Sequence, residues 1–139
     1  MERWSIVVVI LGLLLMVSGA QATTPSPSGA VVYIISPADG ATVSSPVRVL
    51  FGLKGMGVAP AGIDKANTGH HHLLIDGATQ DMSKPIAKDA THKHFGGGQT
   101  ETLIDLKPGK HSLQLLMGDK AHMPHQPPIM SEKITITVK

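Results

Sequence analysis

The sequence lacks cysteine altogether and has few aromatic residues. Among its 139 residues are one Trp, one Tyr and two Phe, and the single Trp lies at position 4. A domain held together by disulfide bonds is therefore excluded, so packing or a bound ligand must supply its stability. The scarcity of aromatic side chains also argues against a surface on which nucleic acid bases or sugar rings would stack.

The chain also has little excess of positive over negative charge. The formal net charge is +2, from 12 basic and 10 acidic residues that are dispersed along the chain. Binding to nucleic acid or to an acidic membrane surface depends on clustered positive charge. We therefore expect no nucleic-acid partner, and no general attraction to membranes.

The first 22 residues have the pattern of a secretory signal peptide. Arg3 precedes an apolar run over residues 6–17, and small residues ending at Ala22 form an A-x-A cleavage pattern. The run is shorter than the ~20 residues that a spanning helix needs, and no cysteine follows to which a lipid could be attached. We expect cleavage after Ala22 and a periplasmic or secreted protein that meets the membrane only through this segment. A retained N-terminal anchor is the alternative.

The rest of the chain predicts one all-β domain. Residues 23–30, rich in Pro, Ser and Thr, indicate a short disordered leader before a single domain over residues 31–139. Short β-branched runs alternate with Pro and Gly, and no segment keeps the period of an amphipathic helix. This pattern favours an immunoglobulin-like antiparallel β-sandwich. Strands are expected at residues 31–36, 47–53, 70–76, 100–106, 111–117 and 129–138.

All eight histidines lie between His70 and His125. Imidazole titrates near neutral pH and is the commonest metal ligand, so this clustering is the main indication of function. Because residues i and i+2 of a strand share a face, His70 and His72 should present their rings together, with Leu74 and Asp76. His71, Leu73 and Ile75 should point the opposite way. His92 and His94 form a second such pair if that stretch is extended.

Convergent histidines in a chain without cysteine predict a transition-metal site. Copper is expected before zinc, since nearby methionines would favour Cu(I), and a carrier or accessory protein before an enzyme. Three carboxylate or amide side chains could orient the rings by hydrogen bonds. The predicted ligands are His70, His72, His92 and His94 in the first place and His122, His125 and Met123 in the second, with Asp76, Gln99 and Glu101 as orienting groups.

Two other functions fit the same residues. The histidines could form a structural hydrogen-bond network in a module that binds another envelope protein without metal. They could also serve a metalloenzyme, because copper-zinc superoxide dismutases place an H-x-H pair on a strand of a β-sandwich; that likeness is architectural only. No serine lies in an activated-nucleophile pattern. The Gly96–Gly98 run lacks the Lys and the following helix of a phosphate loop, so it indicates a tight turn or a close approach of the backbone.

Four segments carry a resemblance to a known family. They are GHHHLLID at 69–76, HFGGGQTE at 94–101, LKPGKHSLQL at 106–115 and GDKAHMPHQPP at 118–128. Together they resemble a family of small secreted bacterial proteins labelled as a domain of unknown function, DUF4399, over about residues 35–138. The resemblance implies an extracytoplasmic β domain and supplies no catalytic residue.

Overall fold

The computed structural model describes residues 22–139, so the predicted signal segment before Ala22 lies outside the described residues. Every regular element in this range is a β-strand. Residues 22–139 contain no helix long and apolar enough to cross a membrane. The predicted all-β class is therefore confirmed for the part of the chain that the structure describes.

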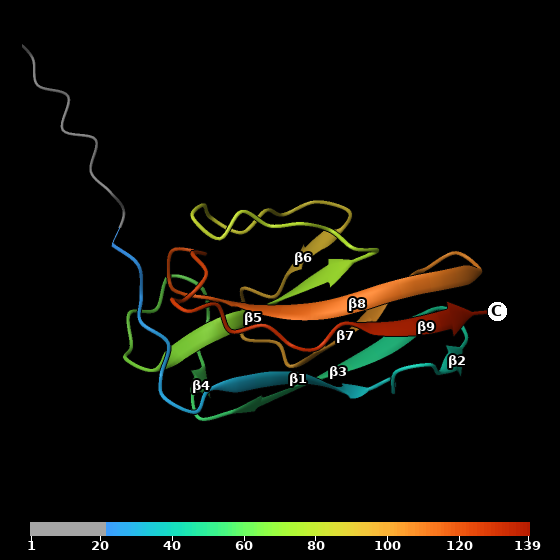
Figure 1. The fold of residues 1–139 in the computed structure, drawn as a ribbon, viewed down its shortest axis with the longest axis horizontal. Helices are drawn as coiled ribbons and strands as arrows, with labels where there is room; N and C mark the ends of the chain where they lie inside the picture. The colour runs from blue at the N-terminus through green and yellow to red at the C-terminus, as the bar shows by residue number, and fades with distance from the viewer. Residues whose placement is uncertain (1–21) are drawn as a thin grey trace, which may run out of the picture.

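The strands form two sheets (Figure 1). The smaller sheet is antiparallel and has the order β1-β3-β7. The larger sheet has the order β2-β9-β8-β5-β4, and β6 pairs with β5 beyond the end of β4. The bounds are β1 Val31–Ser36, β2 Thr42–Val43, β3 Val47–Lys54, β4 Gly57–Val58, β5 Thr68–Ile75, β6 His92–His94, β7 Glu101–Ile104, β8 Gly109–Gly118 and β9 Ile134–Val138.

Strand β5 is an inner strand of the larger sheet. It pairs antiparallel with β8 along most of its length and with β6 on its other side. The short strands β4 and β2 pair in parallel with β5 and β9. The larger sheet is therefore mixed, whereas the sequence predicts antiparallel pairing throughout. Seven of the eight residues of β5 are buried, because one face packs on the smaller sheet and loops cover the other.

The period-two alternation of β5 divides its side chains between two apolar clusters. Leu73 and Ile75 enter the main core between the sheets, together with Phe51 of β3 and Leu115 of β8. Leu74 points to the opposite face, where Leu116 and Ile86 form a second, smaller cluster. The connection over residues 76–91, which runs across this outer face in Figure 1, contributes Ile86 and closes that face.

Two segments differ from the prediction. The last strand begins at Ile134 and not at residue 129. Pro127 and Pro128 have no N–H to donate to a ladder, and residues 129–133 approach β8 through an isolated bridge at Met130 and single backbone hydrogen bonds. Residues 23–30, predicted as disordered, are hydrogen-bonded: the Ser26 amide donates to the Gln126 carbonyl, and the Gln126 amide donates to the Thr24 carbonyl.

Candidate metal centre

Three consecutive histidines on β5 point alternately to the two faces of the larger sheet. His70, His71 and His72 are each 0% exposed. His71 faces the main core, where its ring lies 5.1 Å from that of Phe51. His70 and His72 point to the outer face, as the alternation predicts, with their ring centroids 4.7 Å apart.

Four imidazoles meet on this outer face. The rings of His94 and His122 each lie 5.1 Å from that of His70 and 4.8 Å from one another. His72 lies 5.1 Å from His94 and 6.2 Å from His122. The Nε2 atoms of His70 and His72 are 2.9 Å apart, and those of His94 and His122 are 3.1 Å apart. We call these four residues the histidine cluster.

Strand pairing brings His94 to the cluster. In the antiparallel register of β5 and β6, His94 lies opposite His72, and such cross-strand pairs present their side chains on the same face. His94 is half-buried, whereas His72, its partner across the strands, is fully buried. The edge strand β6 therefore places a third ring above the two on β5.

A turn organised by Asp119 supplies His122. The buried Asp119 carboxylate accepts hydrogen bonds from the amides of Ala121 and Met123 at 2.8 and 2.9 Å, an Asx-type turn. The backbone of His122 takes a positive φ of 64° there and its amide donates to the Asp119 carbonyl. Asp119 is absent from the residues predicted from sequence, although a Gly-Asp pair shortly before a histidine is a turn signal that could have indicated it.

Two glycines make room for the rings. A Cβ atom added to Gly96 would lie 2.3 Å from Cε1 of His94, and one added to Gly118 would lie 2.8 Å from Nε2 of His72. Both distances are much shorter than a van der Waals contact distance. The Gly96–Gly98 run, predicted to allow a close approach, thus provides at Gly96 the surface on which the His94 ring rests.

Burial favours the neutral form of three rings in the cluster, those of His70, His72 and His94. Desolvation, followed by the charges of His122 and His94, lowers the pKa of His70 to about 4. Desolvation and then His70 lower the pKa of His72 to about 2. The pKa of His94 is also lowered, first by desolvation and then by His122 and Lys88. Metal ions bind neutral imidazole, so these rings are in the required state at neutral pH without losing a proton.

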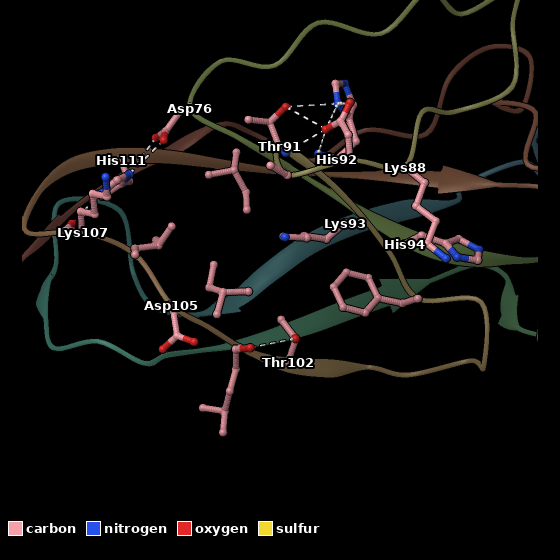
Figure 2. A pocket seen from close by; sticks show the side chains of 17 residues that line it. Asp76, Lys88, Thr91, His92, Lys93, His94, Thr102, Asp105, Lys107 and His111 are labelled. Carbon is pink, nitrogen blue, oxygen red and sulfur yellow. Dashed lines mark hydrogen bonds and ion pairs between the residues drawn. The ribbon is translucent and has the colours of Figure 1, made fainter.

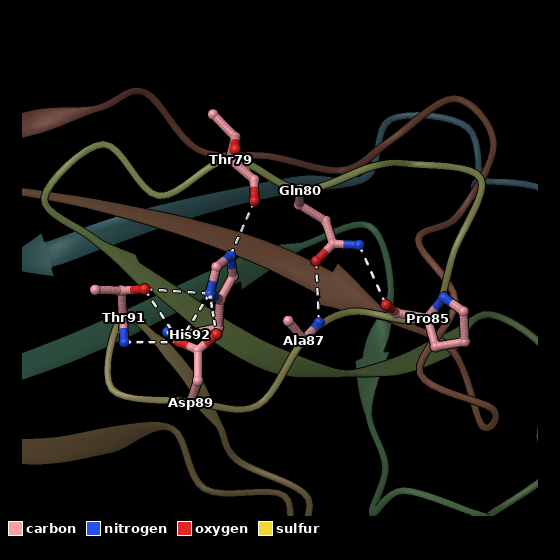
Figure 3. A network of polar contacts seen from close by, with 7 residues as sticks. All are labelled: Thr79, Gln80, Pro85, Ala87, Asp89, Thr91 and His92. Atoms are coloured by element: carbon pink, nitrogen blue, oxygen red, sulfur yellow. Dashed lines mark hydrogen bonds and ion pairs between the residues drawn. The ribbon is translucent and has the colours of Figure 1, made fainter.

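His92, predicted as a ligand, has a different role (Figure 3). Its Nδ1 contacts the Asp89 carboxylate at 2.9 Å, and its Nε2 faces the Thr79 carbonyl at 3.0 Å. Both ring nitrogens therefore lie against oxygen atoms of the connecting loop and not against the rings of the histidine cluster. The contacts fasten both ends of the connection between β5 and β6. They also hold Asp89 ionised, because the hydrogen bond to His92 keeps the pKa of that carboxyl well below its usual range.

His125 and Met123, the other predicted ligands, are buried next to the cluster's loop. His125 is 1% exposed and its Cε1 lies 2.9 Å from the position of an added Cβ on Gly69, a residue that shares the inward face of β5 with His71. Met123 is 2% exposed. The nitrogen donors that lie within 4.8 Å of one another are those of His70, His94 and His122; the ring nitrogens of His72 and His125 are not part of this set.

The three side chains that were predicted to orient the rings make their contacts away from the histidine cluster. Asp76 contacts Nδ1 of His111 at 2.9 Å, a cross-strand pairing on the far end of β5. The Gln99 side chain accepts from the Gly97 amide at 2.9 Å. Glu101 forms an exposed ion pair with Arg48 in the smaller sheet. None of these side chains makes a described hydrogen bond to the histidine cluster.

A groove borders the cluster at the open edge of the sandwich (Figure 2). It has a volume of about 790 Å³ and runs between β6 of the larger sheet and the β7 segment of the smaller one. Ile75, Phe95 and Ile104 supply apolar walls, Lys93 extends into its centre, and Lys88 lies beside His94 at one end. His94 therefore belongs both to the cluster and to an accessible surface.

The geometry of the cluster suits a four-coordinate ion. Ligand nitrogens at 2.0–2.1 Å from a tetrahedral metal are separated by roughly 3.3 Å. The two shorter nitrogen pairs, at 2.9 and 3.1 Å, need only a small expansion to reach that value. The Nδ1 atoms of His70 and His72 are buried without a hydrogen-bond partner. Three imidazoles, those of His70, His94 and His122, offer grouped nitrogens that can close on one ion, and His72 lies beside them with its Nε2 2.9 Å from that of His70. These donors are of the type preferred by Zn(II) and Cu(II).

Comparison with known proteins gives a family and no function. The sequence model of the family described as "Domain of unknown function (DUF4399)" matches residues 49–139. No curated protein and no solved structure matches the chain. The matched range contains every histidine of the protein.

Proposed function

The chain belongs to the DUF4399 family, whose description assigns no function, and we propose that it is an extracytoplasmic protein that binds one transition-metal ion. The ion is copper before zinc, and the protein acts as a carrier or accessory protein. The observation that carries the proposal is the convergence of His70, His72, His94 and His122, whose ring centroids all lie within 6.2 Å of one another. Their ring nitrogens would hold the ion.

The preference for copper rests on nitrogen donors alone. The sequence favours copper through nearby methionine sulfur, but Met117 belongs to the main core on the opposite face of the sheet, and Met130 packs against the smaller apolar cluster of the outer face. For a site of fixed nitrogen ligands, divalent copper binds more tightly than divalent zinc, following the general order of first-row metals. The all-imidazole set therefore still favours copper, now as Cu(II).

Carriage is favoured over catalysis by the number of ligands. Catalytic metal sites commonly keep one position open for water or substrate, whereas His72, beside the three grouped donors, would supply a fourth ring that closes the site around the ion. Access is nevertheless retained, because His94 and His122 are only partly buried while His70 and His72 are fully buried. A site with two deep and two superficial ligands is suited to taking up an ion and passing it on.

Isothermal titration of the untagged, metal-stripped protein with Cu(II) and Zn(II) tests this function. We expect one ion per chain, with a dissociation constant below about 1 µM, and loss of binding in the double variant His70→Ala/His72→Ala. His92→Gln is the matched control, since both ring nitrogens of His92 already contact the protein; it should bind metal like the wild type. Weak binding that the double variant retains would overturn the proposal and leave the cluster as a structural network in an envelope interaction domain.

A further inference from the structure

A long connection covers the outer face of the larger sheet, where the histidine cluster lies. Residues 77–91 leave β5, cross this face and return to β6 (Figure 1). The outer face of a sheet without such cover commonly lies open to solvent, yet His70 and His72 are each 0% exposed. The connection therefore has a part in burying the two ligands that β5 provides.

Ile86, in the middle of the connection, meets the cluster in two ways. Its Cδ1 and the Nε2 atom of His72 lie 3.2 and 2.8 Å from one point, the position of an added Cβ on Gly118. Its backbone amide donates to the His122 carbonyl at 2.8 Å. The residue itself is 6% exposed. One residue of the connection thus packs beside a deep ligand and also holds the backbone of a superficial one.

The ends of the connection are held separately from its middle. The His92 ring contacts Thr79 near one end and Asp89 near the other. Over residues 80–88, the bond from the Ile86 amide is the one hydrogen bond to the rest of the domain among the residues that the structure describes. The middle of the connection therefore meets the domain chiefly through Ile86.

Internal polar contacts brace this middle part (Figure 3). The Gln80 side chain accepts from the Ala87 amide at 3.0 Å and donates to the Pro85 carbonyl at 3.2 Å. Regions with few bonds to the rest of a protein are those that open locally. A braced segment that is fixed at its ends and joined to the site by one residue can open as a unit.

We propose that residues 77–91 form a lid that opens to let the metal ion enter and leave the histidine cluster, and that Ile86 is the residue that closes it. Opening moves the Ile86 side chain away from His72 and frees the His122 carbonyl. A deep ligand then becomes accessible while a superficial one gains freedom to move. Closure of such lids excludes water, and their opening commonly limits how fast a ligand leaves. This inference rests on the proposed metal-binding function and adds the route by which the ion is exchanged.

The rates of metal exchange test the lid. Association of Cu(II) with the untagged mature protein, and its removal by a chromophoric chelator, are followed by stopped-flow mixing. For Ile86→Ala we expect both rate constants to rise on the order of tenfold, because truncation of a buried isoleucine removes packing that keeps the lid closed. Their ratio, the dissociation constant, should change by less than about twofold, because easier opening of both the free and the loaded protein favours neither state.

Ile104→Ala is the matched control. Ile104 is also 6% exposed, but it lies on β7 in the main core and not on the outer face. Its rate constants should equal those of the wild type. Gln80→Ala removes bracing contacts and leaves Ile86 in place, so it should raise both rate constants by a smaller factor. It decides the question if Ile86→Ala does not fold.

Four results would overturn the inference. Tight copper binding with wild-type rates in Ile86→Ala and Gln80→Ala would remove the lid and leave the metal site standing. Equal acceleration in Ile104→Ala would show that general loosening of the fold admits the ion. A faster dissociation without faster association would make Ile86 a support of the loaded site and not a gate. Absence of copper binding by the wild type would overturn the lid together with the proposed function.

Discussion

At the residue scale, the histidine cluster depends on small neighbours as much as on its ligands. The ring of His94 lies against Gly96, and the ring of His72 lies against Gly118. Neither glycine has a positive φ, so space and not backbone conformation requires glycine at these positions. A methyl group would displace a ring nitrogen from the point where the four imidazoles converge.

We therefore expect Gly96→Ala to weaken metal binding with little loss of stability. The added Cβ would lie 2.3 Å from Cε1 of His94, so the ring must move. Changes next to metal ligands commonly reduce affinity by about 10–100-fold, and we expect a loss in that range in the calorimetric titration. The free energy of unfolding should change by less than about 1 kcal/mol, because alanine can adopt the backbone conformation there.

Gly57→Ala is the control for this substitution. An added Cβ at Gly57 would meet Cγ2 of Thr68 at 3.5 Å, an ordinary contact, and Gly57 also has no positive φ. Its metal affinity should equal that of the wild type. Equal affinities for the Gly96 and Gly57 variants would show that the His94 ring does not need its present position.

The residue pattern named three members of the cluster, His70, His72 and His94, among the first ligands and His122 among the second. Strand alternation placed His70 and His72 together, and pairing of an extended 92–94 segment added His94. His92 shares that pattern, but both of its ring nitrogens contact oxygen atoms of the connecting loop. His122 takes its place through a loop turn with a positive φ. Spacing in sequence contains no information about such loop contacts, because they depend on where the chain returns in space.

At the element scale, the loop over residues 119–125 is fixed from both sides. Within the loop, the Asp119 carboxylate accepts the amides of Ala121 and Met123. From outside, the Thr24 hydroxyl donates to the same carboxylate at 2.6 Å. The N-terminal segment is therefore a structural support of the loop that carries His122.

Asp119→Ala should release this loop. Asp119 is 4% exposed, and loss of its buried, charge-assisted hydrogen bonds should lower the free energy of unfolding by about 3 kcal/mol. His122 would lose its fixed position, so metal affinity should fall on the order of tenfold. Thr24→Val removes one of the three hydrogen bonds and should have a smaller effect on both quantities. Chemical denaturation and metal titration of the two variants measure this; unchanged metal affinity in Asp119→Ala would mean that the turn does not position His122.

The elements themselves were largely predictable from sequence. The bounds of β1 agree with the prediction. Those of β3, β5 and β8 differ from the predicted bounds by at most two residues at each end. Strong β-branched runs and turn residues determine such strands locally. The two-residue strands β2 and β4 were not predicted, because each is defined by parallel pairing with another strand: β2 with β9, far along the chain, and β4 with the next strand, β5. Tertiary contact, which the local pattern does not encode, creates them.

At the scale of the whole molecule, the three histidines of β5 place imidazoles on both faces of one buried sheet. On the outer face they form the proposed metal site. On the inner face, His71 lies in the main core against Phe51, and neither of its ring nitrogens has a hydrogen-bond partner among residues 22–139. Burial lowers the pKa of His71 to about 4. The same strand thus provides ligands and a titratable group inside the core.

This buried imidazole makes stability depend on pH. In the unfolded chain a histidine takes up a proton below pH 6.5, whereas folded His71 resists protonation until about pH 4. The unfolded state therefore binds more protons between these values, so the free energy of unfolding falls as the pH falls through this window. A shift of this size corresponds to about 3 kcal/mol per group. His111 acts in the opposite sense, because the Lys107 carbonyl and then Asp76 raise its pKa; its contribution is present at low pH and lost as the pH rises.

His71→Phe isolates the contribution of the core imidazole, since phenylalanine can pack on Phe51 and has no nitrogen to protonate. The variant and the wild type, both metal-free, are unfolded by urea at several pH values between 4 and 8. Above pH 6.5 the difference in their free energies of unfolding should be constant. Below it, the difference should shift in favour of the variant, by up to about 3 kcal/mol near pH 4. A difference that is independent of pH would show that His71 is protonated as readily in the folded protein as in the unfolded chain, and hence that solvent reaches this part of the core.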